Sequence, residues 1–153
     1  MNKKINLGAG NDCLKGYINH DLIKHSDKID IIVDLNLDNW QEVILKKYPN
    51  KFEEVRAWDL IEHLDNPINF MDNCWHLLKD DGILTMKACG WKNPNYYVDI
   101  THKHGYDIRS FDYFDPTTEL GQRYGYYTSY KWEILSLNYD RHFNVLVKMR
   151  RIK

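Results

Sequence analysis

The stretch that decides the fold is Ile5-Asn6-Leu7-Gly8-Ala9-Gly10-Asn11, followed closely by Tyr17-Ile18-Asn19-His20-Asp21. Each segment predicts a short β-strand; the first ends in a glycine turn and the second in an acid. Glycine lets backbone N–H groups approach a ligand closely because it has no side chain. An acid at the end of the next strand can accept both hydroxyls of a ribose, as in nucleotide-binding βαβ units. Together, these features favour a ligand that contains a nucleoside.

The connection between these two strands limits the kind of nucleotide. Only residues 8–16 separate them, whereas a parallel crossover usually takes about a dozen residues or more. Residues 11–15 can form one helical turn at most, and there is no full Gly-x-Gly-x-x-Gly pattern. A long helix that could hold a pyrophosphate at its N-terminus is therefore not expected. This counts against NAD or FAD and favours a ligand with adenosine but no phosphate.

Working outward, strands and helices alternate along the chain. A third strand is expected over residues 29–33, ending at Asp34, and a helix from about Asp38, where Asp38 and Gln41 have the spacing of a capping box. Further strands are expected at residues 55–58 and 83–86, with a helix between them that Asn66-Pro67 opens and Asp81-Gly82 closes. Residues 132–139 and 143–149 predict a hairpin. The expected fold is α/β: a Rossmann-like three-layer sandwich with a mostly parallel sheet and a C-terminal antiparallel hairpin.

Residues 90–130 differ from the rest of the chain. Gly, Pro, Asn, Tyr and His dominate there, and only residues 108–114 suggest a short helix. A long loop region in a compact domain is often functional. We therefore expect a single domain over residues 1–153, in which residues 90–130 bind the substrate.

Composition excludes several classes of protein. Hydrophobic residues are 43% and charged residues 28%, which is typical of a globular chain rather than a disordered one. With 21 Lys and Arg against 22 Asp and Glu, the chain lacks the positive field of a non-specific nucleic-acid binder. No apolar run reaches the roughly 18 residues of a membrane helix, and the lack of a signal-peptide pattern predicts a cytoplasmic protein. The three cysteines, Cys13, Cys74 and Cys89, form no CxxC pair that would indicate zinc or redox chemistry.

Four segments, in order, resemble the motifs of one enzyme family. Residues 5–11 resemble the first motif of class I S-adenosylmethionine-dependent methyltransferases, and residues 17–22 the second-strand motif of their short-loop, methyltransferase-11-like members. Residues 55–64, VRAWDLIEHL, are similar to the fourth-strand "EHL" segment of the small-molecule and glycan branch, and residues 77–84, LLKDDGIL, to the segment that leads into the fifth strand. The resemblance covers residues 4 to about 115 and implies S-adenosylmethionine as the cofactor.

The resemblance also implies roles for matching positions. The glycine turn would lie against the methionine and ribose of the cofactor, the second-strand acid would bind the ribose hydroxyls, the third-strand acid and the next residue would hold the adenine, and the end of the fourth strand would line the reacting side. The implied cofactor residues are Gly8, Ala9, Gly10, Asn11, Asp21, Leu22, Asp34, Leu35, Trp58, Asp59 and His63. Two departures bear on cofactor affinity: the third glycine is replaced by Asn11 or Asp12, and the first helix is nearly absent.

Methyl transfer needs close, aligned contact between two bound partners. Aromatic faces can hold the sulfonium cation at roughly 0.5–2 kcal/mol each, and Trp58, Trp91, Tyr96 and Tyr97 are candidates, although Trp58 is equally well explained as a core residue. A hydroxyl acceptor also needs a base. His63 and His102 are the candidates, because histidine titrates near neutral pH.

Other interpretations of these histidines remain open. A histidine in a polar loop is more often simply solvated. His102 and His104 with Asp99 could instead bind a metal, but nothing in the sequence supplies further ligands, so we predict no metal site.

The sequence therefore favours methyl transfer to a hydroxyl of a small molecule, such as a sugar or a glycan intermediate. The glycan preference rests only on the resemblance of residues 99–114. A non-catalytic cofactor- or partner-binding module is the alternative. A nucleic-acid methyltransferase is disfavoured by the charge balance, and Asn93-Pro94-Asn95-Tyr96 is interpreted as a turn rather than a base-methylation motif. The expected partner is a small-molecule acceptor, and a second subunit could complete its pocket in a homodimer.

Overall fold

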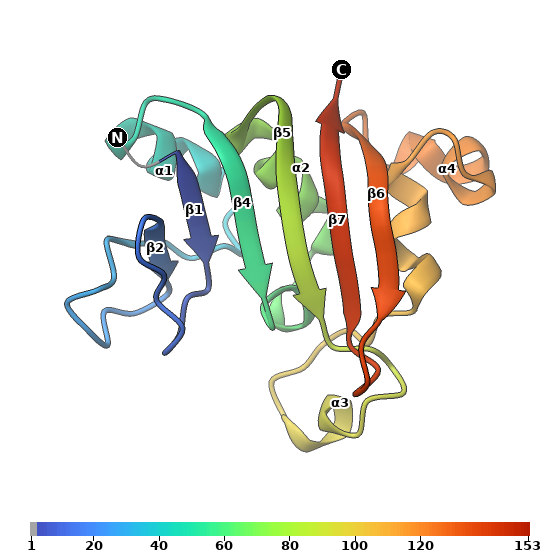
Figure 1. Cartoon of the computed structure of the whole chain (residues 1–153), viewed down its shortest axis with the longest axis horizontal. Helices are drawn as coiled ribbons and strands as arrows, with labels where there is room; N and C mark the ends of the chain where they lie inside the picture. Colours follow the sequence, from blue (N-terminus) through green and yellow to red (C-terminus); the bar gives the residue numbers. More distant parts are fainter. Residues whose placement is uncertain (1–2) are drawn as a thin grey trace.

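A computed structural model describes residues 3–153 and shows one seven-stranded sheet in the order β3-β2-β1-β4-β5-β7-β6 (Figure 1). Strands β1 to β5 are parallel, and β7 runs antiparallel to both β5 and β6. The strands are β1 Lys4–Leu7, β2 Ile18–Asp21, β3 Ile31–Ile32, β4 Phe52–Trp58, β5 Leu78–Ala88, β6 Lys131–Tyr139 and β7 Val145–Ile152. The mostly parallel sheet and its closing hairpin are confirmed.

The sheet order determines where a ligand can bind. β1 lies between β2 and β4, so the winding changes direction there, and the carboxyl ends of β1, β2, β4 and β5 reach the same edge of the sheet. In open α/β sheets, ligands bind outside this edge, at the switch point.

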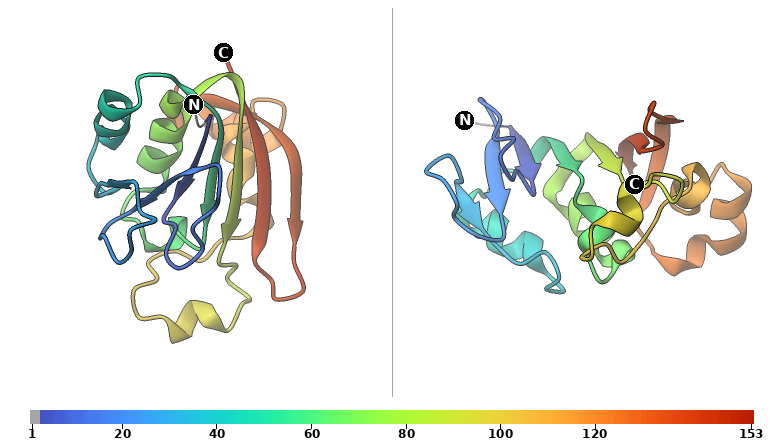
Figure 2. Two further views of the ribbon diagram at one scale, coloured as in Figure 1. Left: turned by 60° about the vertical axis from the view of Figure 1, so that its left-hand side comes forward. Right: turned by 90° about the horizontal axis from the view of Figure 1, so that it is seen from below.

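The helices form one layer and not the two that the expected three-layer sandwich would have. They are α1 Trp40–Lys47, α2 Pro67–Leu77, α3 Asn95–Val98 and α4 Glu119–Tyr124, with the 3₁₀ turns η1 Ile61–His63, η2 Ile108–Phe114 and η3 Gly125–Tyr127. α1, α2, η2 and α4 all lie on one face of the sheet (Figures 1 and 2). Within residues 3–153 no helix covers the other face, because the β1–β2 and β2–β3 connections are short and contain none. The Rossmann-like sheet therefore has one helical layer.

The uncovered face of the sheet is polar. Lys4 pairs with Glu54 at 2.8 Å, and Arg56 pairs with Asp12 at 2.7 Å. The Arg56 guanidinium also stacks 4.0 Å from the centre of the Trp58 ring. These charged side chains let a largely parallel sheet, whose two faces are usually both buried, present one face to solvent.

The core lies between the sheet and the helical layer. Alternate residues of the strands point into it, as the period of two requires. Its fully buried members include Ile5, Leu7, Val55, Leu84, Met149, Trp40, Ile44, Phe70, Met71, Cys74 and Trp132. No helix in the described part of the chain is both long and apolar enough to cross a bilayer.

The boundaries of α1 and β3 differ from expectation. α1 begins after Asn39 and has no side-chain cap, so the capping box of Asp38 and Gln41 is not formed; the Gln41 N–H instead donates to Asn73 Oδ1 at 3.1 Å. β3 is only Ile31–Ile32, and as the edge strand of the sheet it pairs with β2 alone.

The start of α2 was predicted correctly, but its end was not. It begins at Pro67 as predicted, with Asn66 Oδ1 accepting the N–H of Asn69 at 3.0 Å. It ends at Leu77 rather than at Asp81-Gly82, because Leu78 already pairs with Phe52 of β4. Asp81 adopts a left-handed conformation (φ 60°) inside the β5 segment instead of closing the helix.

Residues 90–130 contain more helix than the sequence predicted. Beyond residues 108–114, α3, α4 and η3 are present. α4 is short and is capped by Thr118 Oγ1, which accepts the N–H of Gly121 at 3.0 Å. α3 and η3 have no side-chain cap, and helical turns as short as these carry too little apolar periodicity to be predicted from it.

Candidate active site

The glycine turn and the second-strand acid meet at the carboxyl ends of β1 and β2. Gly8 and Gly10 have left-handed φ angles of +62° and +50°, which glycine adopts without the strain of a side chain. The Gly10 N–H donates to Asp21 Oδ2 at 2.7 Å, and the Leu22 N–H donates to Asp21 Oδ1 at 2.7 Å. Burial would raise the pKa of Asp21, but these N–H donors hold it below its ordinary value. Asp21 is therefore a fixed carboxylate.

Asp34 and Leu35 follow β3, as the sequence indicated. Asp34 Oδ1 accepts the N–H of Asn36 at 2.9 Å and so forms a local turn. The Leu35 side chain is buried in the core. Both residues thus have structural contacts of their own at this edge.

Trp58 ends β4 on the polar face of the sheet, one residue beyond Ala57, which pairs with Leu7 of β1. Its ring stacks on Arg56 and also lies 5.1 Å from Lys87 Nζ. Two cations of the chain therefore lie against the ring that was a candidate for holding a sulfonium. The next residue, Asp59, has φ 51° and pairs with Lys87 at 2.6 Å, where β4 turns into η1.

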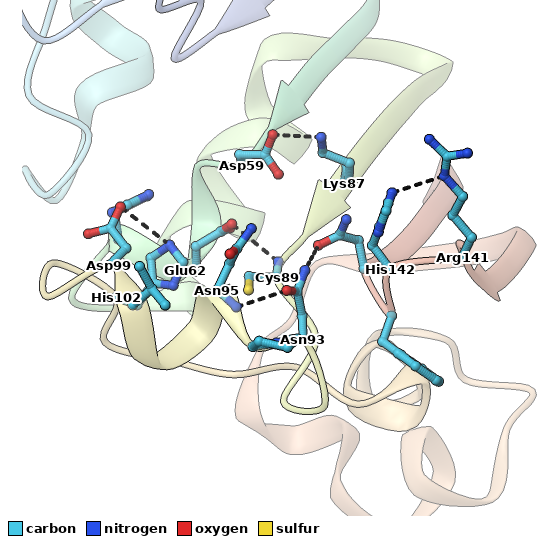
Figure 3. Close-up of a pocket in the computed structure, with 15 residues that line it drawn as sticks. Asp59, Glu62, Lys87, Cys89, Asn93, Asn95, Asp99, His102, Arg141 and His142 are labelled. Carbon is cyan, nitrogen blue, oxygen red and sulfur yellow. Dashed lines mark hydrogen bonds and ion pairs between the residues drawn. The ribbon is translucent and has the colours of Figure 1, made fainter.

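A cavity of about 830 Å³ lies at the carboxyl ends of β4 and β5, closed by the β6–β7 turn. Figure 3 shows Glu62, Asp99 and His102 grouped on one side of it and Arg141 and His142 on the other. Acidic and imidazole groups therefore face a cationic and amide-rich wall. The amides are Asn93, Asn95 and Asn144.

Glu62, His63 and His102 form the tightest cluster in this cavity. One ligand atom of each lies within 4.8 Å of those of the other two, and the His63 and His102 ring centres are 4.7 Å apart. Glu62 is 1% exposed, and its Oε1 accepts the Cys89 N–H at 3.2 Å. Burial raises the pKa of Glu62 to about 7, and the charge of Asp59 adds to the shift.

A hydrogen-bond chain fixes the proton on His63. Thr101 Oγ1 donates its single proton to Asp99 Oδ1 at 2.7 Å, so it can only accept from His63 Nδ1, 2.8 Å away. The Nδ1 atom of His63 therefore carries the proton, and Nε2 keeps a lone pair. Burial, followed by the neighbouring His102, lowers the pKa of His63, which favours the neutral ring near pH 7.

The remaining aromatic and histidine candidates are scattered. Trp91 Nε1 donates to Asp107 at 3.1 Å, and Tyr97 is 77% exposed. The Tyr96 ring stacks 6.3 Å from His102. His104 lies in the same loop as His102 but outside the three-residue cluster.

Sequence reasoning missed Glu62, Thr101 and the contribution of the β6–β7 turn. Glu62 directly precedes His63 in the "EHL" segment, and this position was the signal available for it. Thr101 and Asp99 orient His63 only because the chain folds back, since His63 and Thr101 are 38 positions apart.

Comparisons with known proteins identify the fold. No protein-family profile matches the chain, and no curated protein sequence matches it. A Haloferax volcanii protein, solved in complex with the methyltransferase activator Trm112, superposes with a TM-score of 0.62 at 10% identity, over 97% of this chain and 81% of its own. A SAM-dependent methyltransferase from Archaeoglobus fulgidus gives 0.58 at 13% identity, over 96% and 85%. The trans-methyltransferase CalH, in complex with SAH, gives 0.56 at 12% identity, over 98% and 51%. The chain has the fold of class I SAM-dependent methyltransferases.

Proposed function

We propose that this protein is an S-adenosylmethionine-dependent methyltransferase whose acceptor is a hydroxyl of a small molecule, such as a sugar or a glycan intermediate. The observation that carries the proposal is the 2.7 Å bond from the Gly10 N–H to Asp21, at the sheet edge that also bounds the 830 Å³ cavity. A turn for a nucleoside thus lies beside a polar pocket for a second substrate. The fold, shared with SAM-dependent methyltransferases, supports the choice of cofactor.

The residues at the glycine turn fit this cofactor. A Cβ atom at Gly10 would meet nothing within 4 Å, so there is room above the turn for a ligand. Each Asp21 oxygen accepts one backbone N–H, and a carboxylate oxygen has a further lone pair for a ribose hydroxyl. His25 Nε2, 3.4 Å from Asp21 Oδ2, is the group that ribose would replace. The other residues that would hold the cofactor are Gly8, Ala9, Asn11, Leu22, Asp34, Leu35 and Asp59.

The chain's own chemistry in the reaction is proton removal. S-adenosylmethionine, when bound, would supply a methyl group attached to a sulfonium sulfur. Loss of the methyl group would leave that sulfur as a neutral thioether. His63 Nε2 would take the proton of the acceptor hydroxyl as its oxygen accepts the methyl group. The bonded chain through Thr101 to Asp99 holds the ring in the required tautomer and stabilises the charge that it gains.

The cavity wall supports a hydroxyl-rich acceptor. Its amide and imidazole groups both donate and accept hydrogen bonds, as a hydroxyl does. Asn93 Nδ2 donates to Asn144 Oδ1 at 2.7 Å, which ties the β5–α3 segment to the β6–β7 turn and makes that wall rigid. Lys87 and Arg141 add positive charge, which would also suit an acidic sugar derivative.

A partner-binding module is the second candidate, and one observation favours it. Large apolar side chains are exposed around the short edge strand β3: Leu22, Ile23, Ile32, Leu37 and Val43. Exposed apolar side chains beside an unpaired strand are typical of an interaction surface. One protein of this fold is known in complex with a methyltransferase activator. In this view the chain binds a protein, with or without the cofactor, and transfers no methyl group alone.

A transfer assay separates the two candidates. The purified chain is incubated with methyl-labelled S-adenosylmethionine and panels of monosaccharides, sugar phosphates, nucleotide sugars and phenols. Labelled product in a hydroxyl-bearing class is expected. If the chain binds the cofactor but labels no acceptor in any panel, the binding module is the better account.

A further inference from the structure

Two buried polar atoms in the cavity lack any hydrogen-bond partner in the described residues: Glu62 Oε2 and His102 Nδ1. Glu62 is 1% exposed, and the His102 side chain is 8% exposed. Buried polar atoms without partners are rare, and each needs an explanation. Here both atoms belong to residues of the cluster with His63, in which one ligand atom of each residue lies within 4.8 Å of those of the other two.

We propose that Glu62, His63 and His102 bind a divalent transition-metal ion. Two imidazoles and one carboxylate are a donor set that zinc accepts in sites with an open position, and that related transition metals also accept. Magnesium and calcium prefer oxygen donors and water and fit this set less well.

The backbone holds the three donors together. The Glu62 carbonyl accepts the N–H groups of Lys103 at 2.8 Å and His104 at 3.3 Å. These bonds clamp the His102 loop onto η1, so His102 lies against Glu62 although the two residues are far apart in sequence. The site is therefore part of the fold and not an accident of two mobile side chains.

The surroundings of His63 favour a ligand role as well. Histidine ligands usually give their other ring N–H to a carboxylate or carbonyl, which fixes the ring and its tautomer. His63 gives Nδ1–H to Thr101, which in turn donates to Asp99, so Nε2 is left with its lone pair.

The spacing indicates a modest closure on binding. Donors about 2.1 Å from a tetrahedral zinc ion lie about 3.4 Å from one another, whereas these atoms lie within 4.8 Å. Glu62 is fixed by its bond to Cys89, so the closure would come from the side chains of the two histidines.

The use of the ion in catalysis rests on the proposed function, but the site itself does not. A hydroxyl that binds a divalent ion loses its proton more readily. In the loaded protein His63 would thus be a ligand, and the acceptor proton would pass to solvent.

The test is metal binding by the full chain, stripped with EDTA and freed of it, without any S-adenosylmethionine. Zn²⁺ is titrated by calorimetry, and Co²⁺ is followed by its visible absorption bands. One-to-one binding is expected. Glu62→Gln and His102→Asn should each weaken it by more than about a hundredfold, because loss of an outer partner of a ligand alone typically costs about tenfold to a hundredfold. The matched control is His104→Asn, which changes a histidine of the same loop outside the cluster and should leave binding unchanged.

Folding of each variant is checked by circular dichroism. Thr101→Val keeps all three ligands and should still weaken binding by about tenfold, because it frees the His63 ring. The proposal is overturned if the wild type takes up no stoichiometric metal, or if binding survives unchanged in Glu62→Gln and His102→Asn. Metal binding without cofactor binding would keep this site and remove the proposed function, and cofactor binding without metal binding would do the reverse.

Discussion

The two halves of the ligand-binding edge are built differently. At the glycine turn, Asp21 is 11 positions from Gly10 and both of its oxygens accept backbone N–H groups. In the cavity, Glu62 and His102 come from separate segments, and each leaves a buried atom without a partner among the described residues. The pKa of Asp21 is held below its ordinary value, whereas burial raises that of Glu62. The first half is preformed, whereas the second contains two buried polar atoms that the proposed ion would contact or neutralise.

The largest expected effect is the loss of methyl transfer on substitution of His63, which lies in the cavity half. His63→Asn removes the Nε2 lone pair, which would take the acceptor proton in the metal-free protein and bind the ion in the metal-loaded protein, so in either state the rate of methyl transfer should fall by about 10²–10⁴-fold. S-adenosylmethionine affinity should stay the same, because the substitution leaves the glycine turn intact. Single-turnover rates and calorimetric titrations measure the two effects separately. A parallel loss of cofactor affinity would show that the two halves are not independent.

A pair of glycine substitutions tests the preformed half. Gly8 and Gly10 are both left-handed, which costs roughly 1–2 kcal/mol for alanine. A Cβ atom at Gly8 would also lie 2.9 Å from Leu60 Cδ1, whereas one at Gly10 meets open space. Gly8→Ala should therefore lower the free energy of unfolding by about 2–3 kcal/mol, and Gly10→Ala by about 1–2 kcal/mol.

Denaturant titration measures both values. The outcome that contradicts this account is an equal cost for the two variants. Gly10→Ala also serves as a probe of the cofactor, because its new methyl group would occupy the space above the turn.

The pH dependence of stability sharpens the contrast further. The pKa of Asp21 is lower in the folded chain than in the unfolded one, so its contribution is fully present above the unfolded value. It is lost as pH falls through the folded value. Asp21→Asn should therefore lower stability by about 1–2 kcal/mol at pH 7, and the two proteins should converge in acid. Urea titrations from pH 7 to pH 3 test this, and a constant gap across that range would argue against an ionised Asp21.

The preformed half could be predicted from sequence because it is local. Ile5 and Leu7 alternate toward the core, the glycine turn follows at once, and Asp21 ends the next strand. The short connection at residues 8–16 even indicated the missing first helix. The connection between the second and third expected strands, residues 22–28, was also too short for a covering helix, but the expected three-layer sandwich did not take this into account.

The cavity half could be predicted only in part. His63 and His102 were recognisable as single candidates, but their contact depends on the bond from the Lys103 N–H to the Glu62 carbonyl. Such a bond has no sequence pattern. Trp58 was a candidate cofactor contact because of its position at the strand end; its ring packs against Arg56 and Lys87 but is still 42% exposed, so a cofactor contact stays a prediction.

The proposed cofactor site at the glycine turn and Asp21 can be tested by calorimetry. S-adenosylmethionine and its demethylated product are titrated into the wild type and into Asp21→Ala. We predict one-to-one binding by the wild type, with affinity about a hundredfold weaker in Asp21→Ala, since a carboxylate that bonds two hydroxyls contributes about 1.5–3 kcal/mol. Micromolar affinity corresponds to about −8 kcal/mol and is readily measured. Absence of binding by the folded wild type at millimolar ligand, or equal binding by both proteins, would contradict the account.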